Sequence, residues 1–510
     1  MLSVLLWIPF IGAVVLIVLP GLQDSRRAQW VALLLATFAF AWTIFLGFQF
    51  DFSATGSQFQ ERLSWLETLG LQYQVGVDGL SYPLVVLNNL LTCVAIYGSD
   101  PDKERPRFYY SLLLLLNFGV VGAFLSENLL LFFLFYEIEL IPLYFLIAIW
   151  GGARRGYAAT KFLIYTAVSG IAILGSFLGL VWLSGAESFA LQRDLAETLT
   201  LTQQLILLGG LLLGFGIKIP LVPLHTWLPD AHVEASTPVS VLLAGVLLKL
   251  GTYGLLRFGL GLFPEAWSVL APYLATWAVV SVLYGALTAI AQTDMKKMVA
   301  YSSVGHMGYI LLAAAANTPL SLVAVIVQMI SHGLISALLF LLVGVVYTKT
   351  GTRDLTVLRG LLNPERGLPL IGSLMVVGVM ASAGIPGMVG FISEFLVFRS
   401  SLPVFPVQTL LCMIGTGLTA VYFLLLVNRA FFGRLITRSD GKVVTLAPVI
   451  WRERSPAILL AILIVVFGLQ PNWLVDWTRA TIADFSGSPA VLAQRTTLPE
   501  ADLARAITLH

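Results

Sequence analysis

The stretch that decides the fold spans residues 214–223 and reads Gly214-Phe215-Gly216-Ile217-Lys218-Ile219-Pro220-Leu221-Val222-Pro223. It sets a lysine and two prolines inside an apolar segment. A proline removes a helical hydrogen bond and clashes with the carbonyl four residues back, so Pro220 frees the carbonyl of Gly216 and Pro223 frees that of Ile219. Irregular backbone at membrane depth persists only inside protein or beside a wet cavity. We therefore predict a broken membrane-spanning helix that carries a buried Lys218.

A second cluster of helix breakers lies about 165 residues further on and reads Ala383-Gly384-Ile385-Pro386-Gly387-Met388. Interrupted spans at corresponding places in two halves of a chain are typical of inverted-repeat transporters. Five spans over residues 108-258 pair with five over residues 270-431, and the break falls in the fourth span of each set. We predict two inverted five-helix repeats, preceded by membrane helices in 1-107 and followed by a loop, a last helix and a tail in 432-510.

The composition places the whole chain in a membrane. Of its 510 residues, 58% are hydrophobic and only 11% are charged, whereas a soluble domain carries about 25% charged residues. This excludes a soluble enzyme and a disordered scaffold, and the net charge of +2 provides no basic field for nucleic acid. The two cysteines, Cys93 and Cys412, lie far apart in apolar segments, which argues against a disulfide, a zinc site or an iron–sulfur site.

Segments of roughly 20 apolar residues are long enough to cross a bilayer. About fourteen such segments are present, which predicts an all-α integral membrane protein. They lie near residues 2-20, 29-49, 82-98, 108-126, 128-150, 162-184, 202-224, 237-258, 270-291, 297-316, 320-346, 367-398, 405-431 and 455-472.

The distribution of Lys and Arg predicts the orientation of these spans. No basic residue precedes the first apolar run, and Arg26 and Arg27 follow it, which indicates a retained first span rather than a cleaved signal peptide. Cytoplasmic loops carry an excess of Lys and Arg. Basic loops alternate along the chain with acidic or nearly uncharged ones, such as 50-81 and 185-200, although the acidic stretch 225-236 departs from this pattern. We expect both termini on the outer, lumenal side.

Four ionisable residues lie within the apolar segments: Glu137, Lys218, Lys249 and Glu394. A charge at the bilayer centre costs about 2.5–3.5 kcal/mol or more, so a residue that carries one is interpreted first as functional. The competing interpretation is a structural ion pair or a side chain that reaches the interface, and it is weakest for Lys249, whose apolar run continues on both sides. Glu139 points about 200° away from Glu137 on a helix, so it is either a second carboxylate of the site or a contact between helices.

Two histidines extend this set. His306 has Ser302 four residues before it, and His332 has Gln328 four before it and Ser336 four after it. Residues at i and i+4 share a helix face, so each histidine lies on a polar stripe. Hydrogen bonds between helices explain a single stripe. Several stripes joined to buried Glu, Lys and His favour a wet proton path, because His titrates near neutral pH.

These groups suggest one lateral proton axis. A buried glutamate beside Lys218 holds the lysine proton by attraction, and weakening that pair passes the proton onward. Lys249 is then the central relay, His306 and His332 are links, and Glu394 is the exit.

A further polar run follows the first break and includes His225, Trp227, Asp230 and His232. We expect it to form a polar plug or to cap a half-helix. A metal site built on Asp230 and His232 is unsupported, because no third ligand has a telling spacing.

Several motifs together carry a resemblance to a known family. They are Glu137-Ile138-Glu139-Leu140-Ile141-Pro142-Leu143-Tyr144, Lys218-Ile219-Pro220, Trp227-Leu228-Pro229-Asp230-Ala231-His232, Leu248-Lys249, Ser302-Ser303-Val304-Gly305-His306-Met307-Gly308, His332-Gly333 and Gly384-Ile385-Pro386-Gly387. Over roughly residues 80–435 the chain resembles the antiporter-like proton-pumping subunits of respiratory complex I. A glutamate at position 394 resembles the chain 4 type of these subunits, since sister subunits usually have Lys at the matching position. The run from Glu139 to Pro142 and the run from Trp150 to Arg155 resemble the photosynthetic branch, in cyanobacteria and plastids.

The resemblance implies a role for each buried residue. By this resemblance, Glu137 and Lys218 match the family's coupling pair, and Lys249 matches its central relay. His306 and His332 match the bridging histidines, and Glu394 matches the distal acidic terminus.

The resemblance also implies a setting. The chain would be a proton-translocating membrane-arm subunit of an NAD(P)H- or ferredoxin-quinone oxidoreductase in a thylakoid membrane, and would itself bind no cofactor. NAD(P)H or ferredoxin, the iron–sulfur clusters and plastoquinone would belong to other subunits. Its partners would be the lipid bilayer and neighbouring membrane-arm subunits, antiporter-like ones included, and no nucleic acid.

Other functions remain open at this point. A subunit of a multi-subunit cation/proton antiporter shares the fold and much of the motif set, and a membrane subunit of a hydrogenase-linked complex is a third candidate. A structural scaffold would use the buried charges only to hold helices together. Partners separate the first three, whereas a scaffold would lose assembly rather than pumping when Lys218 or Lys249 is neutralised.

Overall fold

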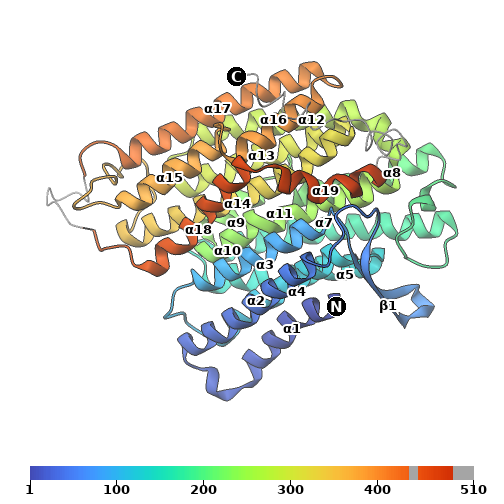
Figure 1. The fold of residues 1–510 in the computed structure, drawn as a ribbon, viewed down its shortest axis with the longest axis horizontal. Coiled ribbons are helices and arrows are strands. Elements are labelled where there is room, and N and C mark those ends of the chain that lie inside the picture. The colour runs from blue at the N-terminus through green and yellow to red at the C-terminus, as the bar shows by residue number, and fades with distance from the viewer. Residues whose placement is uncertain (436–445, 486–510) are drawn as a thin grey trace.

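The computed structural model describes residues 1–435 and 446–485. They form an almost entirely helical bundle in which most helix axes are roughly aligned (Figure 1). The interior is filled by aliphatic and aromatic side chains. Many large apolar side chains remain exposed on the outer helices, among them Leu34, Ile171 and Leu424. An apolar surface of this kind suits a bundle surrounded by lipid.

The N-terminal part holds three helices and a hairpin. In chain order its elements are α1 (Leu2–Val18), the 3-10 turn η1 (Pro20–Leu22), α2 (Ser25–Gly47), β1 (Gln58–Leu66), η2 (Glu67–Leu69), β2 (Leu71–Val77) and α3 (Tyr82–Tyr97). The strands pair antiparallel, with Leu63 opposite Tyr73 and Leu66 opposite Leu71. The sequence analysis treated residues 50-81 only as a loop, so this hairpin is an addition to the predicted fold.

The next part contains the first break. Its elements are α4 (Pro106–Leu125), α5 (Leu129–Ile138), α6 (Leu140–Trp150), α7 (Arg155–Ser184), η3 (Arg193–Ala196), α8 (Leu201–Lys218), α9 (Trp227–Glu234), α10 (Thr237–Leu242), the π-helix η4 (Leu243–Leu247), α11 (Leu248–Gly254) and the π-helix η5 (Leu255–Leu260). Helix α8 ends at Lys218, just before the first proline, where the sequence places the break. The span from Thr237 to Leu260 is buried except at Thr237 and Arg257, which are partly exposed, so it forms the centre of the bundle.

The following part contains the second break. Its helices are α12 (Pro264–Ile290), α13 (Met295–Ala316), α14 (Pro319–Thr350), α15 (Pro369–Ser382), α16 (Val389–Ser401) and α17 (Pro406–Phe431). The chain leaves the helical conformation between α15 and α16, where Gly384 has φ +68° and Gly387 has φ +88°. Glycine adopts these positive φ values without a steric penalty, which explains why the break is built around this Gly-Ile-Pro-Gly run.

Two helices close the described chain, α18 (Trp451–Leu469) and α19 (Asn472–Phe485), with a bend of 69° between them. The sequence analysis did not predict α19. It crosses the face of the bundle in Figure 1 and is held there by a hydrogen bond from the backbone N–H of Gly79 to Thr481 Oγ1 (2.8 Å). The expected C-terminal tail beyond residue 485, which includes His510, lies outside the described residues.

Ten described helices are long and apolar enough to cross a membrane, or up to eleven if the bent pair α18–α19 is counted as one span. The expected number of about fourteen is therefore not confirmed. The remaining expected segments correspond to shorter apolar helices, namely α1, α3 and α15. The fold is an all-helical multi-pass membrane architecture.

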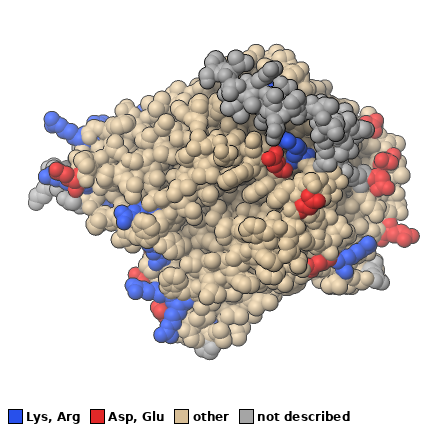
Figure 2. All heavy atoms as spheres, in the orientation of Figure 1, with Lys and Arg blue, Asp and Glu red and all other residues tan. Residues whose placement is uncertain are grey.

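Charged side chains are sparse on the face shown in Figure 2 and gather at its two ends. Lys and Arg are more frequent toward the left end, whereas Asp and Glu are more frequent toward the right end. This unequal distribution is the kind that the positive-inside rule relates to orientation.

Candidate functional site

Lys249 lies at the centre of the buried span, on α11 immediately after the π-helix η4. Its side chain is completely buried. The ammonium donates a hydrogen bond to the carbonyl of Ala244 (2.6 Å), and Nζ lies 2.7 Å from Nδ1 of His332 on α14. Short π-helical stretches occur frequently at functional sites. The predicted central relay is thus in direct contact with one of the predicted bridging histidines.

The two histidines lie next to each other. The ring centroids of His306 on α13 and His332 on α14 are 5.6 Å apart. Nδ1 of His306 lies 2.8 Å from the carbonyl oxygen of Ser302, and its Nε2 lies 3.6 Å from Oε1 of Glu394 on α16. His306 therefore stands between His332 and the acidic residue that follows the second break.

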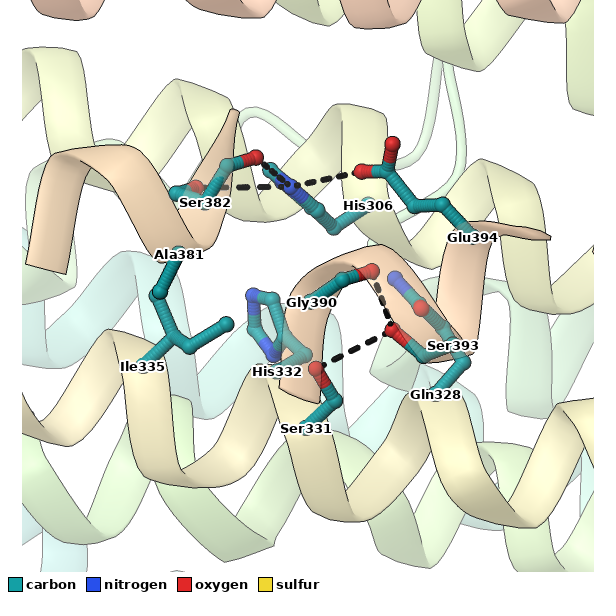
Figure 3. Close-up of a pocket in the computed structure, with 10 residues that line it drawn as sticks. All are labelled: His306, Gln328, Ser331, His332, Ile335, Ala381, Ser382, Gly390, Ser393 and Glu394. Carbon is teal, nitrogen blue, oxygen red and sulfur yellow. Dashed lines mark hydrogen bonds and ion pairs between the residues drawn. The ribbon is translucent and has the colours of Figure 1, made fainter. Parts of the chain in front are cut away.

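A small cavity separates these groups, and Figure 3 shows the side chains around it. Its volume is about 10 Å³, which is roughly the room that one water molecule requires. Oε1 of Gln328 and Nε2 of His332 have no hydrogen-bond partner in the described protein, and both residues line the cavity. The site therefore offers polar contacts at which a single water could connect the two histidines to Glu394.

Glu394 has partners that the sequence analysis did not identify. Thr416 on α17 donates a hydrogen bond to its Oε2 (2.9 Å), and the hydroxyl of Tyr309 lies 3.1 Å from Thr416 Oγ1. Tyr309 lies three residues after His306 and so shares its helix face, which was the available signal. Thr416 lies among ordinary apolar residues, and no local pattern distinguishes it.

Lys218 has two carboxylates near it. Its direct ion pair is formed with Glu139, at the junction of α5 and α6, and the charge of Glu137, which the sequence pairs with Lys218, also acts on the ammonium. Both side chains of this pair are buried. The ammonium also lies 4.9 Å from the ring centroid of Tyr136, so the lysine has a carboxylate and an aromatic ring as neighbours.

Glu137 lies near this ion pair and against α7. One of its carboxylate oxygens, Oε1, is buried without a hydrogen-bond partner in the described protein. The carboxylate occupies the space that Gly170 leaves by lacking a side chain. Each glutamate thus has one buried oxygen without a hydrogen-bond partner among the described residues, Oε1 of Glu137 and Oε2 of Glu139, and the two differ in that Glu139 is the direct counter-ion of Lys218.

The structure does not join Lys218 directly to Lys249. Among the described residues, no hydrogen bond connects the two lysines. Helices α8 and α11 nevertheless pack closely, because a Cβ at Gly251 would lie 3.1 Å from Cβ of Lys218. Lys249, His332, His306 and Glu394 thus form a series in which the two histidine ring centroids are 5.6 Å apart, and the Lys218–Glu139 ion pair lies outside this series.

The polar run after the first break has structural contacts of several kinds. Asp230 forms an ion pair with Lys161 on α7 (2.8 Å), and the ring of His232 stacks on Phe340 with 4.4 Å between centroids. In the described parts of the chain no group of three His, Cys, Asp or Glu could hold a metal ion. Both nitrogens of His225 and both of His232 are buried without a partner there.

Lys161, Tyr165 and Ser169 recur at a spacing of four residues on one face of α7, and this polar stripe connects helices. Ser169 donates to the carbonyl of Gly214 (2.7 Å) and lies 2.9 Å from the hydroxyl of Tyr136. Tyr165 lies 2.8 Å from Oγ1 of Thr226. These contacts fix α7 to the helices that carry Lys218 and its neighbours.

The chain is similar to known membrane proteins along almost its whole length. Residues 126–419 match the family model described as NADH:quinone oxidoreductase/Mrp antiporter, transmembrane. A Synechococcus protein (strain JA-3-3Ab) named NAD(P)H-quinone oxidoreductase chain 4 1 is 40% identical over 96% of this chain and 96% of its own length. A protein named NAD(P)H-quinone oxidoreductase chain 4 from Prochlorococcus marinus (strain NATL2A) is 39% identical over 93% of this chain and 89% of its own.

Chains of two solved membrane complexes have a similar fold. A chain of respiratory complex I from Thermus thermophilus with bound NADH superposes with a TM-score of 0.85 at 27% identity, covering 96% of this chain and 99% of that one. A chain of the Mrp complex from Dietzia shares the fold, with a TM-score of 0.83 at 21% identity and coverage of 97% and 99%.

Proposed function

Because this chain belongs to the NADH:quinone oxidoreductase/Mrp antiporter transmembrane family, and its curated relatives are chain 4 subunits matched along almost their whole length, we propose that it is a proton-translocating membrane-arm subunit of an NAD(P)H-quinone oxidoreductase. It works as a part of that enzyme, beside other membrane-arm subunits. Electron transfer takes place elsewhere in the complex, and this chain contributes the movement of protons.

The observation that carries this proposal is the contact series in the membrane interior. Lys249, His332, His306 and Glu394 follow one another, with 2.7 Å between the first two and 3.6 Å between the last two. Each member can bind and release a proton, and the cavity between them admits about one water. A proton can pass along such a series in short steps without entering the lipid.

In this proposal Lys218 and Glu139 form the controlling pair. Glu139 attracts the proton on Lys218 while the pair is closed. When a movement in the neighbouring part of the complex separates the two groups, the buried ammonium loses its counter-ion and gives up its proton, because an unpaired charge is costly in a low-dielectric interior. Glu137 supplies a second carboxylate near this pair, and Tyr136 lies against the ammonium.

The expectations of repeat structure, orientation and location belong to this proposal. The breaks after α8 and between α15 and α16 support two inverted five-helix repeats over 108-258 and 270-431. The unequal charge distribution supports termini on the lumenal side, and the cyanobacterial origin of the relatives supports a thylakoid membrane. NAD(P)H or ferredoxin, iron–sulfur clusters and plastoquinone are assigned to other subunits of the complex.

The proposal is tested by replacing Lys249 with alanine. The complex carrying Lys249→Ala is purified, reconstituted into proteoliposomes and assayed for quinone reduction and for proton uptake together. We expect assembly to persist and the number of protons moved per quinone reduced to fall. The matched control is Lys297→Ala, which removes a lysine near the start of α13 that is not part of the contact series.

Full proton movement in Lys249→Ala would contradict the proposed path. Loss of assembly in that variant alone would instead support the scaffold interpretation. A tag on this chain, followed by extraction in mild detergent, separates the remaining alternative: co-purification with antiporter subunits in place of quinone-reductase subunits would overturn the assignment to the oxidoreductase.

A further inference from the structure

An apolar groove lies outside the proton path, between α2, α3 and α18. Its volume is about 460 Å³, within the range of about 300–1,000 Å³ that is usual for small-molecule sites. Its walls include Leu33, Phe40, Leu90, Val94 and Leu459. Walls of this kind suit a hydrocarbon chain rather than a polar substrate.

The groove is elongated along the helices. On α3 it is lined by Leu90, Cys93, Val94 and Tyr97, which recur at the spacing of one helix face. Seven residues of α-helix extend over about 10 Å. The groove therefore runs from the last residue of α3 into the apolar part of the bundle, which is the direction of an acyl chain in a bilayer.

The end of the groove at Tyr97 is basic. Arg452 donates hydrogen bonds to the carbonyls of Tyr97 (3.0 Å) and Ser99 (2.5 Å). In the described protein, Nε of Arg454 and Oγ of Ser455 are buried without a hydrogen-bond partner, and Ser455 lines the groove. Neither arginine forms an ion pair with a described carboxylate, so both positive charges lack a counter-ion there, and Arg454 Nε and the hydroxyl of Ser455 are the groups without a partner at this end.

Two of the acidic residues nearby already have partners, whereas Asp100, directly after Ser99, forms no ion pair with a described residue and offsets part of the positive charge. Glu453 forms an ion pair with Lys349 (2.8 Å), and Asp24 lies 3.9 Å from Arg27. Arg26 lies on α2 seven residues before the first residue that lines the groove, and seven residues separate positions on one face of a helix. The end of the groove thus has a net positive charge.

We propose that this groove binds an anionic phospholipid. One acyl chain lies between α2, α3 and α18, and the phosphate of the headgroup is bound by Arg454 and Ser455. Trp451 is 61% exposed, and the guanidinium of Arg454 lies 5.1 Å from its ring centroid. Tryptophan is enriched at the level of the headgroups, which places the basic end at the depth where a phosphate is found.

The test uses the intact complex and a phosphatidylglycerol whose acyl chain carries a diazirine. The purified complex is mixed with vesicles that contain this probe and is then irradiated, and the cross-linked peptides are identified by mass spectrometry. We expect cross-links in the peptides of α3 and α18 that line the groove. Excess unlabelled phosphatidylglycerol should remove them, whereas phosphatidylcholine with the same acyl chains, or glycerol phosphate alone, should not.

Two variants test the headgroup contact. Arg454→Gln is expected to lower the yield of these cross-links about fivefold, since one basic residue near a headgroup is worth about that factor in binding. Arg27→Gln, at the same end of α2 but paired with Asp24, should leave the yield unchanged. Ser455→Ala serves as the second variant if the first does not assemble.

Three results would overturn the proposal. Equal competition by phosphatidylcholine would mean that the charge of the headgroup is not recognised. Competition by glycerol phosphate alone would assign the site to a free phosphate rather than a lipid. The absence of cross-links in the groove would mean that a neighbouring subunit covers it. None of these results depends on the proton path, because no residue of the groove belongs to that path.

Discussion

At the scale of single residues, Lys218 has Glu139 as its direct counter-ion and Glu137 as a second carboxylate whose charge also acts on it. The two glutamates are separated by one residue and project in different directions from the junction of α5 and α6. Glu139 therefore reaches α8, while Glu137 rests against Gly170 on α7. The two carboxylates should respond differently to removal of their charge.

Glu139→Gln should impair the stability of the complex, whereas Glu137→Gln should impair proton movement alone. Removing one partner of a buried ion pair leaves an uncompensated charge at a cost of about 3–5 kcal/mol, and Glu139 is the described carboxylate that forms the direct ion pair with Lys218. The amount of assembled complex on a native gel and the protons moved per quinone reduced measure the two effects. An equal loss of assembly in both variants would show that Glu137 shares the role of counter-ion.

His332→Leu should abolish most of the proton movement while quinone reduction by the assembled complex persists. The leucine fills a similar volume but has no nitrogen to take a proton from Lys249. Simultaneous recordings of quinone reduction and of the proton gradient in proteoliposomes provide the measurement. Ser336→Ala is the matched control, because Ser336 lies one turn further along α14 and donates a hydrogen bond to the carbonyl of Gly333 on its own helix. Unchanged pumping in His332→Leu would remove this histidine from the path.

At the scale of elements, the second break depends on a close approach between its two half-helices. Gly390, near the start of α16, faces the carbonyl of Ala381 on α15 so closely that a side chain at this position would collide with it. The partner in this contact is backbone, which cannot rotate away as a side chain can. The half-helices therefore hold Ser382 and Glu394 beside His306 only while position 390 lacks a side chain.

Gly390→Ala should lower the thermal stability of the assembled complex, because overpacking in a close-packed interior costs about 1–3 kcal/mol. Gly417→Ala on α17, where an added methyl group meets no atom within 4 Å, should leave the stability unchanged. The midpoint of thermal unfolding of the purified complex compares the two. If both variants unfold at the wild-type temperature, the close approach is not what holds α15 and α16 together.

The hairpin loop is anchored to the buried span by one ion pair. Arg257 on η5 lies 2.5 Å from Asp78, which directly follows β2, and Asp78 also accepts the backbone N–H groups of Leu80 and Ser81. Both charged side chains are largely buried. The outer hairpin and the central π-helix are therefore coupled mechanically.

Arg257→Leu should destabilise the complex by about 3–5 kcal/mol, the cost of leaving one buried charge unpaired. The double variant Arg257→Leu with Asp78→Asn should recover part of this loss, since no charge then remains buried. Thermal unfolding of both variants and of Arg62→Leu, whose guanidinium contacts Gln72 on the exposed hairpin, provides the comparison. A double variant no more stable than Arg257→Leu would show that the pair is not the anchor.

At the scale of the whole molecule, the unequal distribution of charge predicts which end of the bundle faces the cytoplasm, and this orientation can be tested. Single cysteines are introduced at Gln60 on β1 and at Asp102 in the loop between α3 and α4, and sealed vesicles are treated with a membrane-impermeant maleimide. We expect Asp102→Cys to react only from the cytoplasmic side and Gln60→Cys only from the lumenal side. The native Cys93 and Cys412 lie in helices and should not react. Reaction of both introduced cysteines from one side would contradict the proposed orientation.

The sequence by itself determined the features that depend on local chemistry. The apolar runs identify the membrane class, because the transfer of a helix into lipid depends on its own composition. The end of α8 at Lys218 and the break before α16, at the Gly-Ile-Pro-Gly run from Gly384 to Gly387, could be predicted from the sequence. Both follow from proline and glycine residues, which act on the backbone wherever they stand. Buried Lys249 and Glu394 could be recognised for the same reason, since their cost is set by the surrounding apolar residues.

Only the tertiary structure decided which of these groups meet. Lys249 and His332 are 83 residues apart in the chain, and Lys218 and Glu139 are 79 apart. Their contacts follow from how distant helices pack, and no periodicity along one helix specifies this. The same reason explains why Thr416 beside Glu394, the helix α19 across the bundle and the groove between α2, α3 and α18 were found in the structure and not in the sequence.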